Sequence, residues 1–124
     1  MFYKTLVKNN IPVMGHLGLL PQSAKNFKFK GKQNYEREKI LKEAKLLETA
    51  GVFSMVLECI ESSLAKNITK TIKIPTIGIG ASNNCDGQIL VFDDLIGLNQ
   101  INVRFIKKYT CLLYTSPSPR DLST

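Results

Sequence analysis

The chain has 124 residues, of which 44% are hydrophobic and 22% are charged, and these values are ordinary for a globular protein. This length allows one domain or part of a larger one, and the absence of any run of about 18 apolar residues means that no transmembrane helix is predicted. The formal net charge is +7, but the basic residues are spread along the chain without interleaved aromatic residues, so a solvated basic surface is favoured over a nucleic-acid interface.

The first part of the chain predicts a helix end, a strand, a loop and a long helix. Residues 2–10 are typical of a helix that stops at two asparagines, and residues 11–16 form a short apolar run that predicts a buried strand. Residues 17–32 combine Gly, Pro and Lys without periodicity, which indicates a long loop. Residues 33–50 carry an apolar stripe at helical spacing and predict the clearest helix, with Gly51 as its left-handed cap.

A second strand and helix follow. Residues 52–57 are continuously apolar apart from one serine and predict a strand buried on both faces, as in parallel sheets that helices cover. Ser62 or Ser63 can cap the next helix, whose apolar side chains recur every four residues. Residues 76–80 predict a third strand, with glycines that favour close backbone approach at its end.

The remaining apolar runs complete the predicted fold. Residues 88–92 are favoured as a fourth strand, while a helix that Asp86 caps and Gly97 ends is the alternative. A last helix is predicted near residues 103–109. Because strands and helices alternate along the chain, the predicted class is an α/β fold with a parallel sheet.

The predicted elements also suggest how the chain is organised into domains. Four strands are too few to close a barrel, yet each looks buried on both faces, so we expect a fragment of a larger α/β domain in residues 1–110. Residues 111–124 contain two Ser-Pro steps and no periodicity, and we expect them to be an unrelated or disordered tail.

Glu58 is the most informative candidate for chemistry. It follows the predicted buried strand at 52–57 directly, and active residues of parallel α/β folds gather at the carboxyl ends of strands. A carboxylate at such a position is partly desolvated, which is the environment of a general base. The alternative is a structural glutamate that caps the following turn or pairs with a lysine.

Three further sites are weaker candidates. His16 lies between glycines, so a ligand could approach it, although a lone histidine is more often structural. The glycines of residues 78–80 stand at a strand end where barrels can bind anions through backbone N–H groups, but tight turns use the same pattern. Asp93 and Asp94 could bind a metal ion, yet paired acids at a helix start are commoner.

The cysteine pattern favours free thiols. Cys59, Cys85 and Cys111 have unrelated neighbours, there is no C-x-x-C motif, and the chain has one histidine. These features argue against a zinc site and favour a reducing, cytoplasmic compartment.

Several ordered motifs resemble one enzyme family. The segment IPVMGHLGL at residues 11–19, followed by Pro21 and Gln22, closely resembles a signature of ketopantoate hydroxymethyltransferases. Further stretches that match this family in the same order are residues 31–32, 56–59, 74–81, 85–91 and 105–109. The resemblance therefore extends over nearly the whole chain except its tail.

This resemblance implies a partial TIM-type (β/α)₈ barrel, approximately strands five to eight. The implied reaction is hydroxymethyl transfer from 5,10-methylenetetrahydrofolate to 3-methyl-2-oxobutanoate, which gives 2-dehydropantoate in pantothenate biosynthesis. It also implies Mg²⁺ as cofactor, with its ligands in the half of the barrel that this chain lacks, and a homo-oligomer in the parent enzyme. The fragment alone is expected to be inactive, with a keto acid and folate as partners and neither nucleic acid nor membrane.

The resemblance also assigns roles to individual residues. Glu58 falls on the family's general base, and His16 falls on a histidine beside the substrate pocket with a positioning role. Asp93 and Asp94 do not match the magnesium ligands, so no metal ligand is assigned in this chain. Leu20 and Asp93 depart from the family, which usually has Thr and His at these places.

Two other readings remain open at this point. One is a non-catalytic basic binding module, whose binding to nucleic acid would weaken steeply with salt. The other is a lyase of the related phosphoenolpyruvate and isocitrate lyase-like barrels, which would also use magnesium and an enolate.

Overall fold

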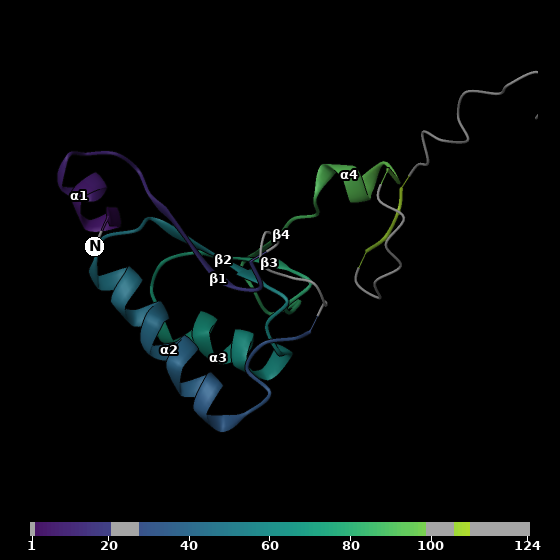
Figure 1. The fold of residues 1–124 in the computed structure, drawn as a ribbon, viewed down its shortest axis with the longest axis horizontal. Coiled ribbons are helices and arrows are strands. Elements are labelled where there is room, and N and C mark those ends of the chain that lie inside the picture. Colours follow the sequence, from purple (N-terminus) through teal and green to yellow (C-terminus); the bar gives the residue numbers. More distant parts are fainter. Residues whose placement is uncertain (1, 21–27, 99–105, 110–124) are drawn as a thin grey trace, which may run out of the picture. The chain divides into compact units, whose positions relative to one another are not determined.

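The computed structural model describes residues 2–20, 28–98 and 106–109, and the chain divides into two compact units, Met1–Ile89 and Leu90–Thr124. In the first unit, a four-stranded sheet lies against helices that cover one of its faces (Figure 1). Within the described ranges, no helix combines the length and the apolar character needed to cross a membrane.

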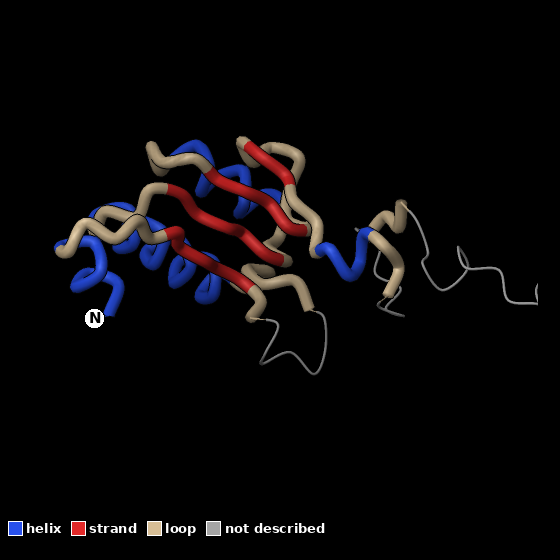
Figure 2. The backbone as a smooth tube through the Cα atoms, turned by 90° about the horizontal axis from the view of Figure 1, so that it is seen from above, coloured by secondary structure: helices blue, strands red, loops and turns tan. Residues whose placement is uncertain are grey.

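The sheet consists of parallel strands that are adjacent in chain order (Figure 2). These strands are β1 (Met14–Gly18), β2 (Ser54–Glu58), β3 (Thr76–Ile79) and β4 (Gly87–Gln88). The predicted α/β fold with a parallel sheet is confirmed. The first strand begins at Met14, three residues later than expected from the apolar run, because Pro12 has no N–H to donate to a strand ladder.

The described helices of this unit are α1 (Phe2–Lys8), α2 (Asn34–Thr49) and α3 (Ser62–Thr71). Figures 1 and 2 both show α2 and α3 on the same face of the sheet. The predicted helix ends are confirmed, because Asn10 and Gly51 adopt left-handed φ values of 58° and 92° just beyond α1 and α2.

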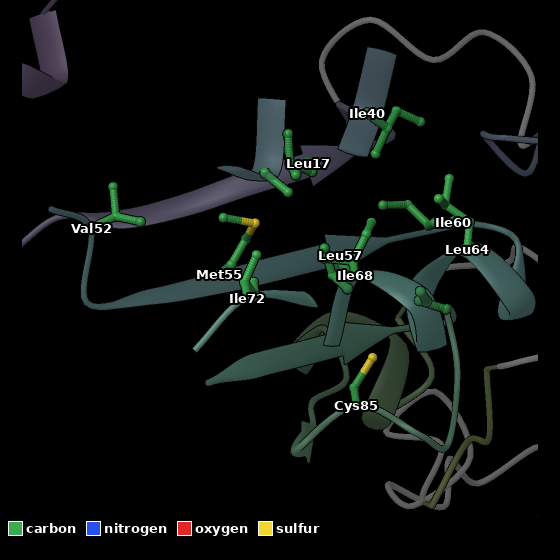
Figure 3. Close-up of a cluster of buried hydrophobic side chains, with 13 residues drawn as sticks. Leu17, Ile40, Val52, Met55, Leu57, Ile60, Leu64, Ile68, Ile72 and Cys85 are labelled. Carbon is green, nitrogen blue, oxygen red and sulfur yellow. The ribbon is translucent and has the colours of Figure 1, made fainter. Parts of the chain in front are cut away.

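The core lies between this face of the sheet and the two helices (Figure 3). All five residues of β2 are buried, as predicted for the second strand. Burial in β1 alternates instead, with Met14 exposed, and neither residue of β4 is buried. The expectation that every strand is buried on both faces is therefore wrong for these two edge strands. The fully buried large side chains of the unit are Met55, Leu57, Ile60, Leu64, Ile68 and Thr76.

The N-terminal cap of α3 is Glu61, and neither Ser62 nor Ser63 fills this role as the sequence suggested. The Glu61 carboxylate accepts hydrogen bonds from the backbone N–H groups of Ser63 and Leu64, at 3.1 and 3.2 Å. It also accepts one from the Ser63 hydroxyl. A negative charge is favourable at this end because unpaired N–H groups and the helix dipole make it positive.

The cap predicts a pH dependence of stability. Hydrogen bonds from the Ser63 hydroxyl and N–H, and then from Arg37 and the Leu64 N–H, lower the pKa of Glu61 from 4.5 to about 2. Because the pKa of Glu61 is lower in the folded state, its ionised carboxylate stabilises the fold at pH values above the unfolded-state pKa. This contribution is lost as the pH falls from about 4.5 to about 2. The melting-temperature difference between the parent and Glu61→Gln should therefore shrink over this range, and a constant difference would contradict the assignment.

The fourth apolar run is only marginally a strand. Pairing ends at Gln88, apart from one further hydrogen bond of 3.1 Å from the Ile89 N–H to the Gly78 carbonyl, so the predicted strand at 88–92 is wrong beyond its first residue. Asp86 does not cap a helix, because its carboxylate accepts from the Thr76 N–H at 2.8 Å. It thereby ties the residue before β4 to the first residue of β3.

The second unit contains the short helix α4 (Phe92–Leu95). The alternative prediction, a helix that Asp86 caps and Gly97 ends, is right about the end, because Gly97 follows α4 with a left-handed φ of 75°. It is wrong about the start, because the helix begins at Phe92. The described residues 106–109 are not helical, which contradicts that part of the predicted last helix, and its other residues lie outside the described ranges. The predicted tail at 111–124 also lies outside them.

Candidate active site

The neighbouring strands β1 and β2 bring His16 and Glu58 together. Glu58 is the last residue of β2, whereas His16 lies two residues before the end of β1, because this strand continues to Gly18 and does not end at His16 as predicted. Nε2 of His16 lies 2.9 Å from Oε2 of Glu58, although the two residues are 42 positions apart in the sequence. Leu17 and Leu57 belong to the core beneath the helices. Because side chains alternate along a strand, the two polar neighbours project from the opposite face of the sheet.

The pair is unevenly buried. The side chain of Glu58 is 9% exposed and that of His16 is 31% exposed. An ionised carboxylate can only accept hydrogen bonds, so His16 donates through Nε2–H and, when neutral, presents Nδ1 as an acceptor. Nδ1 is buried and has no hydrogen-bond partner among the described residues. Within the same ranges, Oε1 of Glu58 makes no hydrogen bond and is the oxygen left to take a proton.

The chain turns sharply just after Glu58. Cys59 has a φ of 50°, a left-handed conformation that costs a residue with a Cβ about 1–2 kcal/mol. Three backbone hydrogen bonds hold this turn. The Leu19 N–H donates to the Glu58 carbonyl at 2.9 Å, and the Lys30 N–H donates to the Cys59 carbonyl at 2.8 Å. The Cys59 N–H donates to the Ile79 carbonyl at 2.9 Å. Backbone strain of this kind gathers at functional sites.

The environment of the Cys59 thiol, next to Glu58 in the chain, disfavours the thiolate, which is the nucleophilic form. Burial, and then the neighbouring Glu58 charge, raise the pKa of Cys59 from 9.0 to about 11, so the thiol stays protonated near neutral pH. Cys59 and Cys85 are free thiols, as predicted, and Cys111 lies outside the described residues.

Gly18 allows the two strands to meet at the site. It pairs in register with Glu58 and has a φ of 104°. A Cβ at this position would lie 2.0 Å from the Glu58 carbonyl oxygen. The sequence indicated low crowding around His16, but it gave no sign that the glycine is required by the neighbouring strand's backbone.

Gly78, the first of the two glycines in residues 78–80, has a packing role in this structure. A Cβ on Gly78 would lie 3.0 Å from the side-chain Oε1 of Gln88 and 3.2 Å from the Cys85 sulfur. These contacts leave no room for a side chain at position 78 and so account for a glycine there.

The two aspartates that the sequence suggested as metal ligands belong to the second unit, whereas His16 and Glu58 belong to the first. Asp93 and Asp94 stand in the first turn of α4, in the second unit. Acidic residues are favourable in the first turn because the amino end of the helix dipole is positive. This is the common role of paired acids at the start of a helix. Among the described residues, no group of three or more His, Cys, Asp or Glu side chains is placed to hold a metal ion.

Comparisons with known proteins agree on one family. A family profile described as ketopantoate hydroxymethyltransferase matches residues 2–116. A protein of Pelagibacter ubique named 3-methyl-2-oxobutanoate hydroxymethyltransferase is 74% identical over 107 residues, which cover 86% of this chain and 42% of that protein.

Proteins with the same name show the same partial coverage. The Bdellovibrio bacteriovorus protein is 52% identical over 108 residues, which cover 84% of this chain and 41% of the relative. The Clostridium botulinum protein is 50% identical over 113 residues, which cover 88% of this chain and 41% of that protein. The chain thus spans about two fifths of the length of the curated relatives that it matches.

Proposed function

Because the chain belongs to the ketopantoate hydroxymethyltransferase family, we propose that the whole protein transfers a hydroxymethyl group from 5,10-methylenetetrahydrofolate to 3-methyl-2-oxobutanoate, giving 2-dehydropantoate. The observation that carries the proposal at residue level is the buried Glu58 carboxylate, which His16 holds through one oxygen. A homo-oligomer in the cytoplasm is part of the same proposal.

We further propose that the sheet forms strands five to eight of a (β/α)₈ barrel. Its strands are parallel and adjacent in chain order, and α2 and α3 lie on one face. A barrel of this kind carries its chemistry at the carboxyl ends of the strands, where Glu58 stands, with His16 two residues before the end of the neighbouring strand. The side of the sheet without helices would then face the barrel interior.

In the proposed reaction, Glu58 is the general base. Its free oxygen, Oε1, removes the hydrogen from C3 of 3-methyl-2-oxobutanoate as a proton, and the electrons of the broken C–H bond form the enolate. The enolate carbon then forms the new C–C bond to the methylene carbon of the folate. Both C–N bonds of that carbon break, and a water molecule supplies the hydroxyl group of the product. The two folate nitrogens take up the proton from Glu58 and the second proton of the water, so tetrahydrofolate leaves. His16 keeps Oε2 in place through Nε2–H, so the carboxylate is oriented before the substrate arrives.

A magnesium ion is expected from the family, but the described residues do not form a site that fits it. The steps above therefore use only side chains of this chain. We propose that the metal ligands lie in the part of the relatives that the match leaves uncovered, and we expect this chain alone to be inactive.

The test uses a completed protein, in which this chain is joined to the portion of the Pelagibacter relative that the match leaves uncovered. With both substrates we expect formation of 2-dehydropantoate, and in D₂O with the keto acid alone we expect exchange of the C3 hydrogen. A folded completed protein that does neither would overturn the proposal. If the completed protein instead binds nucleic acid, and this binding weakens steeply with added salt, the basic binding module is favoured.

A further inference from the structure

Lys30 extends the sheet beyond the end of β2. Its N–H donates to the Cys59 carbonyl and its own carbonyl accepts from the Glu61 N–H, both at 2.8 Å. These two bonds form an isolated parallel bridge between Lys30 and Ile60. The backbone at Lys30 is thus fixed directly to the turn that follows Glu58.

Gly31 is held from the opposite side by the first turns of α2. Its N–H donates to the Glu36 carboxylate at 2.7 Å, and its carbonyl accepts from the Arg37 guanidinium at 3.2 Å. The fit is tight, because a Cβ on Gly31 would lie 2.3 Å from a methyl carbon of Leu64. All the backbone polar groups of Lys30 and Gly31 therefore have partners.

Arg37 connects this segment to the cap of α3. Besides the Gly31 carbonyl, Nη1 donates to the Glu61 carboxylate at 2.8 Å, and Nη2 donates to the Ser63 hydroxyl at 2.9 Å. One planar guanidinium therefore joins α2, the Lys30–Gly31 segment and α3. Lysine could not reproduce this arrangement, because its donors radiate from a single atom.

The contacts of Arg37 lead back to the proposed base. Cys59 keeps a strained left-handed turn only because its surroundings hold it, and the bond from Lys30 is one of three that do so. Glu58 immediately precedes this turn. A shift of the Lys30–Gly31 segment would change the direction in which the Glu58 carboxylate points.

We propose that Arg37 is a positioning residue for Glu58. It holds the Lys30–Gly31 segment across the end of β2, and this segment keeps Cys59 in the turn that directs the carboxylate to His16. The catalytic consequence rests on the proposed function, whereas the geometric consequence, an altered contact between Glu58 and His16, does not.

The geometric consequence can be measured because the chain contains a single histidine. In the completed protein, ¹⁵N-histidine is placed only in this chain by segmental labelling, so one imidazole is observed. We expect a protonated Nε2 and an unprotonated Nδ1 in the neutral parent. In Arg37→Gln the Nε2 resonances should move toward those of Glu58→Ala, which has no side-chain acceptor, and Arg37→Lys should fall between the parent and Arg37→Gln.

The same variants give a kinetic measurement. C3 exchange at saturating keto acid should be about 10-fold or more slower in Arg37→Gln, with a KM that changes by no more than about two-fold, because the base is displaced while substrate contacts remain. Lys39→Gln removes an equal charge from an exposed position of the same helix and should match the parent in both measurements.

The outcomes separate the two proposals. Folded Arg37→Gln with the parent's imidazole signals would overturn the positioning role, even if the protein is active. If Arg37→Gln does not fold, Arg37→Lys decides, and parental imidazole signals in that variant would overturn the role. A completed protein without C3 exchange refutes the proposed function, while the imidazole signals still test the role of Arg37.

Discussion

Replacing Glu58 with Gln in the completed protein should slow exchange of the C3 hydrogen of 3-methyl-2-oxobutanoate by about 10²–10⁴-fold, the usual contribution of a general base. Gln has nearly the shape of Glu, and its amide oxygen can still accept the hydrogen bond from His16 Nε2. The fold should therefore survive, while the group that takes the proton is lost. Exchange is followed by NMR in D₂O without folate, so the proton transfer is observed apart from the second step.

A matched control separates this effect from a loss of charge. Glu38→Gln makes the same change at an exposed position of α2 and should exchange as fast as the parent. If Glu58→Gln also exchanges at the parental rate while both proteins melt alike, Glu58 is not the base. Loss of exchange in both variants would point to an effect of the lost negative charge on the whole protein.

Local sequence patterns were sufficient for much of the fold. The long helix was predicted correctly because a stripe of apolar side chains and a terminal glycine are both local signals. Strand β2 was predicted because residues 52–57 form an apolar run that only one serine interrupts. The family resemblance, which the profile match confirms, rested on motifs of the same local kind. The fourth run failed because a short apolar segment fits a strand and a helix equally well.

The sequence predicted the two main residues of the site but not the contact between them. Glu58 and His16 could be singled out because each stands at the end of an apolar run. Their contact depends on the register of two strands that are far apart in the chain, and no local pattern encodes that register. The left-handed turn at Cys59 and the cap at Glu61 were missed, because serines normally cap helices and a cysteine carries no signal for this backbone conformation.

Replacing Gly18 with Ala should destabilise the completed protein by about 3 kcal/mol or more. The left-handed backbone alone costs a non-glycine residue about 1–3 kcal/mol. In addition, the new methyl group would lie 2.0 Å from the Glu58 carbonyl oxygen, so β1 must move away from β2 and loses hydrogen bonds worth about 1 kcal/mol each. Urea denaturation of the two proteins measures the difference.

Gly87→Ala is the matched control for this prediction. A Cβ on Gly87 meets its nearest atom, on Ile77, at 3.9 Å, which is an ordinary contact. The same methyl group added there should change the stability by less than about 1 kcal/mol. Because Gly18 pairs with Glu58, any folded Gly18→Ala protein should also lose C3 exchange. Equal stability of the two variants would mean that the strands do not approach as closely as this register requires.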